Sequence, residues 1–257
     1  MIFIAAGTRD GRELVCRLLE AGYEVTASVV SHYGKQLLEK YGHTDRLHIN
    51  STAMDKRDLI EYLGTNDIKA FVDATHPYAS NVSENAMGAC RSLNIPYIRY
   101  ERESTPITYG KAYNVLNYED AAKQAAELGH HIFLTTGSRN LEKFVTSPYL
   151  IDASIVVRVL PSSKVISMCE SLGLSPGNII AMQGPFSKEL NIELYKKYNA
   201  DVLVTKNAGH IGGTDTKISA AEAMGIPVVI INRPMITYDN EAHDFNSILK
   251  FLHSRGL

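Results

Sequence analysis

Short β-rich runs alternate with longer amphipathic segments along the whole chain. The run at 2–6 is compact and apolar, and the segment at 11–21 carries Leu and Val at helical spacing until Gly22 stops it. Parallel strands need a crossover connection, which is usually a helix. A repeated β-α order therefore predicts an α/β fold, in which helices cover both faces of a parallel sheet.

The alternation predicts more strands than one compact sheet usually holds. The expected strands are residues 2–6, 23–30, 45–49, 69–73, 95–100, 111–116, 131–135, 155–159, 178–182, 201–205 and 227–231. The expected helices are residues 11–21, 33–40, 56–63, 78–93, 118–128, 138–145, 163–172, 188–198, 217–224 and 240–255. We therefore expect two Rossmann-like domains with parallel sheets, at residues 1–128 and 129–257, and an active-site cleft between them. The break falls within 101–129, where no Gly/Ser linker marks it.

Composition and charge exclude several classes of protein. The chain has 257 residues, of which 45% are hydrophobic and 21% are charged, so it can bury a full core. Its net charge of −2 gives no bias toward polyanions, so we expect no nucleic-acid partner. No apolar stretch reaches about 18 residues, and the N-terminus lacks the basic leader of a signal peptide. We therefore expect neither a membrane span nor secretion.

Three cysteines, Cys16, Cys90 and Cys169, lie far apart in expected helices and show no C-x-x-C spacing. Their pattern is typical of small buried apolar residues rather than of metal ligands or redox groups. We therefore expect no metal site. The same pattern excludes a secreted disulfide framework and fits the reducing cytoplasm.

In open α/β sheets, ligands bind where the loops at the carboxyl ends of the strands converge. The first such loop follows the strand at 2–6, and it contains Gly7, Thr8, Arg9, Gly11 and Arg12. A glycine permits a tight turn here, and the amides of the next helix start can face a phosphate. A complete G-x-G-x-x-G is missing, so a plain βα turn is the alternative. We predict that these five residues bind the phosphates of a dinucleotide.

The loop after the second strand carries Ser28, Ser31 and Tyr33, which can hydrogen-bond a ribose or a phosphate. An NAD site usually has Asp or Glu here for the ribose diol, and an NADP site has a nearby Arg. Neither is present at 27–34. The sequence therefore leaves NADH and NADPH open.

A group of polar residues, Asp73, Thr75, His76 and Tyr78, follows the strand at 69–73. Pro77 suits the first turn of a helix, and Thr75 or His76 can cap that helix, so a purely structural role is the alternative. A cap does not explain Asp, His and Tyr together at the carboxyl end of a strand. We predict that this group contacts the ligand, with Asp73 and Thr75 on the cofactor and His76 or Tyr78 in the chemistry.

Arginines recur near the ends of expected strands, at Arg99, Arg102, Arg139 and Arg158. Single arginines of this kind are commonly surface groups. Several together would hold a carboxylate-rich ligand through paired hydrogen bonds. We predict that Arg99, Arg102 and Arg139 bind such a substrate.

The segment at 205–217 concentrates lysine, glycine and asparagine between a strand and a helix. It lacks the G-x-x-x-x-G-K-[ST] spacing of a P-loop. A flexible loop is the alternative, yet this composition at a helix start is typical of an anion site. The predicted substrate-binding residues here are Lys206, Asn207, Gly209, Gly213, Thr214 and Lys217.

Taken in order, these segments resemble the precorrin-6A reductase family of corrin biosynthesis. The matching pieces span almost the whole chain: G-T-x-x-G-R-x-L at 7–14, D-A-T-H-P-Y-A at 73–79, R-Y-E-R at 99–102, T-G-S-R-N-L at 136–141, G-P-F-S at 184–187, K-N-A-G at 206–209, G-G-T-x-x-K at 212–217 and G-I-P-V-V-x-I-x-R-P at 225–234. The pieces at 73–79 and 206–217 are distinctive, and the ordered set is specific.

The resemblance implies transfer of a hydride from NADPH or NADH to a double bond of precorrin-6A, or of its cobalt complex, giving precorrin-6B. The substrate is then a flat macrocycle with acetate and propionate arms, which suits clustered Arg and Lys. Transient contacts with neighbouring enzymes of the corrin pathway are compatible with this assignment. Aerobic members carry an Arg after the second strand, consistent with NADPH, and the departure at 28–34 favours the anaerobic branch, which tolerates NADH.

Two other functions stay open on the sequence. A short-chain-type reductase of a small metabolite needs a Tyr-x-x-x-Lys pair, and Tyr33, Tyr113 and Tyr149 all lack the lysine at that spacing. A non-catalytic tetrapyrrole carrier or nucleotide-sensing module would bind reduced cofactor without turning over any corrin precursor.

Overall fold

The computed structural model describes residues 1–30, 32–40 and 45–257. The chain forms two compact units, each built on one six-stranded sheet. The first unit contains Met1–Glu103 and Pro234–Leu257, and the second contains Ser104–Arg233. Every strand pair in both sheets is parallel. The expected α/β class with two Rossmann-like units is therefore confirmed, and the expected cleft between the units stays a prediction.

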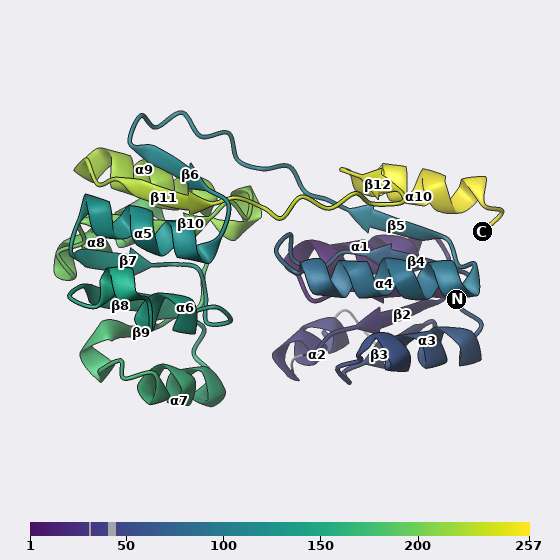
Figure 1. Ribbon diagram of the computed structural model, residues 1–257. Coiled ribbons are helices and arrows are strands. Elements are labelled where there is room, and N and C mark those ends of the chain that lie inside the picture. The colour runs from purple at the N-terminus through teal and green to yellow at the C-terminus, as the bar shows by residue number, and fades with distance from the viewer. Residues whose placement is uncertain (31, 41–44) are drawn as a thin grey trace. The chain divides into compact units, whose positions relative to one another are not determined.

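The first unit has the strand order β12-β5-β4-β1-β2-β3 (Figure 1). Its strands are β1 (Ile2–Ala5), β2 (Val25–Ser28), β3 (Leu47–Asn50), β4 (Ala70–Asp73), β5 (Tyr97–Tyr100) and β12 (Glu241–Ala242). Its helices are α1 (Arg9–Glu20), α2 (His32–Glu39), α3 (Lys56–Thr65), α4 (Ser80–Leu93) and α10 (Phe245–Ser254). The order reverses between β1 and β4, which is the position where open α/β sheets bind dinucleotides.

The alternation of side chains along β1 explains why helices cover both faces of this sheet. Ile2 and Ile4 are buried in a core cluster with apolar residues of α1 and α10. Phe3 and Ala5 point to the opposite face and are buried with residues of α3 and α4. A strand that is apolar at every position must be covered on both sides, as the sequence predicts.

The second unit repeats the same order with different chain segments, β6-β11-β10-β7-β8-β9. Its strands are β6 (Ala112–Val115), β7 (His131–Leu134), β8 (Ser154–Val159), β9 (Ile179–Ala181), β10 (Val202–Lys206) and β11 (Val228–Ile231). Its helices are α5 (Tyr118–Leu128), α6 (Glu142–Val145), α7 (Ser163–Ser171), α8 (Lys188–Lys197) and α9 (Thr214–Met224), with short 3₁₀ turns at Pro148–Leu150, Pro176–Asn178 and His210–Gly212. Here the order reverses between β7 and β10.

The expected domain boundary near residue 129 is corrected by this division. Strand β6 pairs with β11, and α5 packs on β6, β10 and β11, so the second unit begins at Ser104. The C-terminal segment (yellow in Figure 1) returns to the first unit, where Glu241 and Ala242 of β12 lie beside Arg99 and Tyr100 of β5. The first sheet therefore takes its sixth strand from the far end of the chain, whereas all six strands of the second sheet come from one continuous segment.

The other expected elements are present, with two further corrections. The helix expected at 240–255 contains the short strand β12, and α10 begins only at Phe245, where Asp244 caps it by accepting a hydrogen bond from the Ser247 amide at 2.8 Å. The helix expected at 138–145 is reduced to Glu142–Val145. In the described part of the chain, every helix is too short or too polar to span a bilayer.

Candidate functional site

The turn after β1 and the loop after β4 meet at the point where the first sheet reverses its order. Thr8 caps α1, because its Oγ1 accepts a hydrogen bond from the amide of Gly11 at 3.0 Å. The same Oγ1 donates to the carbonyl oxygen of Ala74 at 2.9 Å. One side chain thus fixes the helix start and joins two segments that the sequence separates by more than sixty residues. Both predicted loops lie at one edge of the sheet.

The two glycines of this turn have different surroundings. A Cβ on Gly11 would lie 2.8 Å from Ala6 Cα and 3.2 Å from the Ala74 carbonyl oxygen, so only glycine allows α1 to approach the strand ends this closely. Gly7 is exposed, and none of the described atoms beyond its chain neighbours would lie within 4 Å of a Cβ there. The bare backbone at the start of a 12-residue helix fits a pyrophosphate. Arg9 is exposed and Arg12 is partly buried beside this turn.

The end of β2 lies next to this turn. The carbonyl oxygen of Ser28 accepts a hydrogen bond from the Ala6 amide at 2.9 Å, and the Ser28 side chain is half-buried. Tyr33 is exposed on the first turn of α2. The structure thus places Ser28 where a Rossmann protein contacts the adenosine ribose. Ser31, predicted for the same role, lies outside the described residues.

Asp73 and Arg99 form a buried ion pair on neighbouring strands. Asp73 Oδ1 accepts from Arg99 Nη1 at 2.9 Å and from Thr75 Oγ1 at 2.7 Å, and its Oδ2 accepts from the Tyr97 hydroxyl at 2.7 Å. Arg99 is 1% exposed, and its Nη2 also lies 2.7 Å from Glu101 Oε2. Asp73 and Arg99 therefore bind each other and hold the loop after β4 in place.

The charge on Asp73 is fixed by the same contacts. Burial alone would raise the pKa of Asp73, but the guanidinium of Arg99 and hydrogen bonds from Ser83, Thr75 and Tyr97 together hold it below its usual value. Asp73 was expected to contact the cofactor and Arg99 the substrate. The structure places both inside the unit, where they position Thr75 and the loop that carries His76.

His76 and Tyr78 lie on this loop, between β4 and α4. His76 is exposed, and its Nδ1 accepts a hydrogen bond from the Tyr78 amide at 3.3 Å. The two rings lie 5.7 Å apart between centroids. Because Nδ1 is an acceptor, the neutral imidazole carries its proton on Nε2. The structure therefore brings the two predicted catalytic residues together at the edge of the sheet that also holds the glycine turn.

Arg102 is paired with Asp10, a residue to which the sequence analysis gave no role. Its Nη2 lies 2.5 Å from Asp10 Oδ2, and the two side chains are 11% and 2% exposed. Burial raises the pKa of Asp10, and Arg102 opposes that rise. The pair lies at the first turn of α1, so Arg102 belongs to the surroundings of the glycine turn rather than to an exposed clamp for substrate. The sequence feature that could have identified Asp10 is its position between Gly7 and Gly11, in the turn that is predicted to bind phosphates.

The segment at 206–217 lies at the point where the second sheet reverses its order. Thr214 is fully buried, and its Oγ1 accepts from the Ala208 amide at 3.1 Å and donates to the Lys206 carbonyl oxygen at 3.4 Å. Gly209 and Gly213 have φ of +77° and +66°, which favour glycine. Thr214 and the two glycines thus determine the shape of the loop.

Asn207 holds this loop to another segment of the second unit. Its side-chain amide accepts from the Thr105 amide at 3.0 Å and donates to the Thr105 carbonyl oxygen at 2.9 Å. The backbone carbonyl oxygen of Asn207 accepts a hydrogen bond from Arg233 Nε at 3.0 Å. The structure therefore gives Asn207 a positioning role in addition to the substrate contact that the sequence predicts.

Lys206, Lys217 and Arg139 concentrate positive charge at this end of the second sheet. Lys217 is 9% exposed, and its Nζ donates to the Gly212 carbonyl oxygen at 3.0 Å. Burial, with Arg158 and Lys206 nearby, lowers the pKa of Lys217 to about 7. Burial and Arg139 lower the pKa of Lys206 to about 8. A bound anion would relieve this repulsion, so the arrangement suits a carboxylate or a phosphate.

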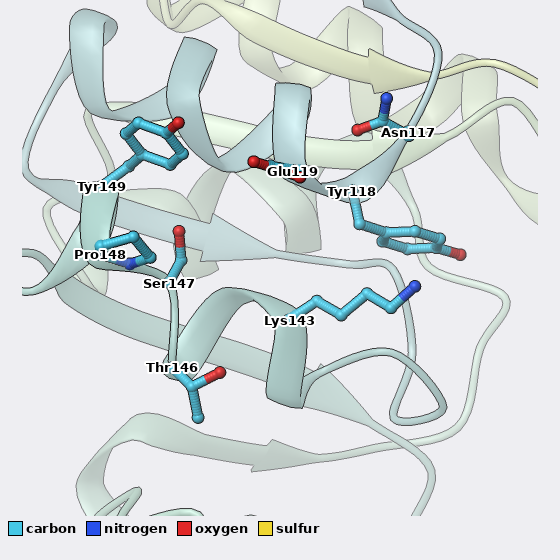
Figure 2. Close-up of a pocket in the computed structure, with 8 residues that line it drawn as sticks. All are labelled: Asn117, Tyr118, Glu119, Lys143, Thr146, Ser147, Pro148 and Tyr149. Carbon is cyan, nitrogen blue, oxygen red and sulfur yellow. The ribbon is translucent and has the colours of Figure 1, made fainter.

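A half-open pocket of about 400 Å³ lies elsewhere in the second unit, at the start of α5 and around α6. Figure 2 shows Lys143 extending toward Tyr118, and its Nζ lies 5.2 Å from the centre of that ring. None of the residues that line the pocket, all of them in the described part of the chain, belongs to the sites predicted from the sequence. The cations at 206–217 therefore remain the stronger candidate for anion binding.

A capped glycine turn at the reversal point of a parallel sheet is the arrangement typical of α/β domains that bind dinucleotides. A family described as "Precorrin-6x reductase CbiJ/CobK" matches residues 1–253. The chain belongs to this family, and it is an oxidoreductase that acts on a CH–CH bond.

Full-length relatives carry consistent names. The chain is 40% identical over 253 residues to a "Cobalt-precorrin-6A reductase" of Priestia megaterium, covering 98% of each protein. It is 35% identical to the protein of the same name from Methanothermobacter thermautotrophicus, over 99% of this chain and 85% of that one. The solved structure of "CobK precorrin-6A reductase" matches with a TM-score of 0.78 at 22% identity, covering 99% of this chain and 97% of that one, which confirms the fold.

Proposed function

We propose that the protein reduces a double bond of cobalt-precorrin-6A or precorrin-6A with a nicotinamide cofactor and yields the corresponding precorrin-6B. The observation that carries this proposal is the 40% identity, over 98% of both chains, to a relative named cobalt-precorrin-6A reductase. The cobalt-containing substrate is favoured, because the full-length relatives at 40% and 35% identity both carry that name. We assign the cofactor to the capped glycine turn of the first unit and the substrate to the cations of the second.

The bound cofactor supplies the hydride, and the protein supplies its binding, orientation and shielding from water. The turn at 7–12 would hold the pyrophosphate on the amides at the start of α1. Ser28, Ser31 and Tyr33 would lie near the adenosine ribose. Since 28–34 contains neither an acidic residue nor an Arg, the site does not discriminate strongly at the 2′ position. We propose that it accepts NADH as well as NADPH.

Reduction of the double bond also requires a proton. We assign it to His76 Nε2, because the Nδ1 of this exposed ring is already an acceptor. Tyr78, whose amide makes that bond, fixes the orientation of the ring. The buried pair of Asp73 and Arg99 holds the loop in place but does not touch the reacting atoms.

The substrate's carboxylate arms would bind to the second unit. Lys217 is buried and Lys206 is partly buried, while Arg139 is exposed and adaptable. Charge-assisted hydrogen bonds of this kind suit acetate and propionate groups. We place the reaction in the cytoplasm, which agrees with three free cysteines, and contacts with neighbouring pathway enzymes stay a prediction.

The proposal is tested by anaerobic incubation of the protein with precorrin-6A and with its cobalt complex, each with NADH and with NADPH, while the absorbance of the reduced cofactor is followed. We expect oxidation with the cobalt complex and with either cofactor. Absence of oxidation in all four combinations would exclude the proposed reaction. Binding of cofactor without any turnover would instead support a non-catalytic module.

A further inference from the structure

Arg158, on β8 of the second unit, is a buried cation without a carboxylate partner among the residues that the structure describes. It is 5% exposed, and its Nη1 donates to Asn191 Oδ1 at 2.7 Å. Its Nη2 is buried, and among the described residues it has no hydrogen-bond partner. The ring of Phe186 covers the guanidinium, 3.9 Å from its centroid. One charged donor is therefore held rigidly in place with hydrogens left to donate.

The surroundings of Arg158 are positive. Burial lowers the pKa of Lys217 most, and the charges of Arg158 and Lys206 lower it further. In the part of the chain that the structure describes, neither an ion pair nor a hydrogen bond joins Arg158 to a carboxylate. Asp215 is the acidic group that acts on Lys217; its Oδ2 lies 2.8 Å from His210 Nδ1, and its Oδ1 is buried without a hydrogen-bond partner among the described residues, so one carboxylate faces three cations. The cluster therefore carries an excess of positive charge.

The first turns of two helices contribute to the same place. Asn191, which binds Arg158, lies on the first turn of α8, and Lys217 lies on the first turn of α9. Helix starts attract anions, so they add to the field of the cations rather than balancing it. Burying a cation without a counter-ion is costly. Packing alone does not account for a guanidinium here, since a neutral side chain would avoid that cost.

We propose that Arg158, with Lys217, forms a binding site for one carboxylate arm of the macrocyclic substrate. The inference rests on the proposed function for the identity of the ligand and on the unpaired Nη2 for the site. Phe186, whose ring covers the guanidinium, lies between exposed residues of the G-P-F-S motif at 184–187. This gives a role to a motif that the proposed mechanism does not otherwise use.

The test compares Arg158→Met with the wild type and with Lys164→Gln, which removes one exposed charge from the same unit. Binding of cobalt-precorrin-6A is measured by calorimetry without reduced cofactor, and KM and kcat are measured with it. Loss of a charge-assisted hydrogen bond predicts roughly ten- to a hundredfold weaker binding and a matching rise in KM for Arg158→Met. Lys164→Gln should match the wild type.

Stability and cofactor binding separate this role from a structural one. Arg158→Met should unfold at the same temperature as the wild type or higher, and its affinity for NADH and NADPH should be unchanged. A folded Arg158→Met protein with wild-type affinity for the macrocycle would overturn the proposal, and so would a loss confined to cofactor binding, which would indicate a phosphate site. If Arg158→Met does not fold, Arg158→Lys decides: weaker macrocycle binding supports the site, and wild-type binding overturns it.

Failure of the proposed function would give a different result. The wild type would then oxidise neither cofactor with either macrocycle, and the site would be probed with uroporphyrin, which carries acetate and propionate arms on a flat ring. Binding to the wild type that is lost in Arg158→Met would still support a carboxylate site. Equal binding to the two proteins, or binding to neither, would overturn it.

Discussion

Replacement of Gly11 by Ala is expected to lower both the stability of the protein and its affinity for the cofactor, because the new Cβ overlaps with neighbouring backbone atoms. The new Cβ would lie 2.8 Å from Ala6 Cα, 3.1 Å from the Ala6 carbonyl carbon and 3.2 Å from the Ala74 carbonyl oxygen. All three are backbone atoms, so no side-chain rotation relieves the overlap. The start of α1 must shift away from the strand ends by several tenths of an ångström.

The size of the effect follows from opposing contributions. Overpacking of this kind costs about 1–3 kcal/mol. The shift also strains the hydrogen bond from the Gly11 amide to Thr8 Oγ1, and loss of such a cap costs about 1 kcal/mol. Alanine recovers up to about 1 kcal/mol through its higher helix propensity. We expect a net loss of about 1–3 kcal/mol in the free energy of unfolding, and a loss of cofactor affinity on the order of tenfold.

Gly7→Ala is the matched control, because it adds the same methyl group to the same turn. Among the described atoms beyond its chain neighbours, none would lie within 4 Å of that Cβ, and Gly7 does not have a positive φ. Its free energy of unfolding should stay within about 0.5 kcal/mol of the wild type. Its cofactor affinity should nevertheless fall, because the methyl group occupies the space where the pyrophosphate approaches the backbone.

The measurements are urea unfolding without ligand and titration of NADH and NADPH into each variant. A Gly11→Ala protein as stable as the wild type would refute the packing argument. Gly7→Ala with wild-type affinity for both cofactors would show that this turn does not hold the pyrophosphate.

Three further predictions concern single side chains. Arg99→Met should lower the free energy of unfolding by about 3–5 kcal/mol, because it leaves Asp73 buried without its counter-ion, and a loss below about 1 kcal/mol in urea unfolding would contradict this. The pKa of Lys217 is about 7 in the folded protein, against 10.5 for an ordinary lysine. Between these pH values Lys217 is therefore protonated in the unfolded chain and neutral in the folded protein. Lys217 should therefore add up to about 1.4 kcal/mol of stability per pH unit between pH 7 and pH 10.5. Unfolding of Lys217→Met at several pH values should show a shallower slope than the wild type, and an equal slope would refute the assignment. His76→Ala should slow single-turnover oxidation of the reduced cofactor by about a hundredfold or more, and an unaffected rate would remove His76 from the chemistry.

The sequence predicts the repeating parts of this fold and fails where pairing is long-range. Periodicity places the strands and helices, because each element must bury its own apolar face. It does not reveal that β12, only two residues long, leaves the last expected helix and pairs with β5. Nor does it show that β6 joins β11, which moves the boundary of the second unit to Ser104. Both errors concern edge strands, whose partners lie far away in the sequence.

The candidate site divides in the same way. The turn with Gly7 and Gly11 can be recognised from the sequence, because a glycine between a strand and a helix indicates a tight turn that a ligand can approach. The pairing of Asp10 with Arg102 cannot be recognised in this way, because it depends on how the end of β5 lies beside the start of α1. Polar residues at strand ends are thus found from the sequence, while their division into ligand contacts and internal ion pairs is not.

Arg99 and Arg158 show what decides between the two roles. Each lies next to last on its strand, and each is almost fully buried. The sequence predicts a substrate contact for Arg99 and none for Arg158. Arg99 lies beside Asp73 in the register of β4 and β5, which supplies a carboxylate directly across the strands. Arg158 lies beside Ile180 in the register of β8 and β9, which supplies none. The first cation is therefore neutralised by the fold, and the second leaves its charge for a ligand. Exchanging Asp73 and Ile180, the residues beside Arg99 and Arg158, would therefore exchange the roles of the two arginines.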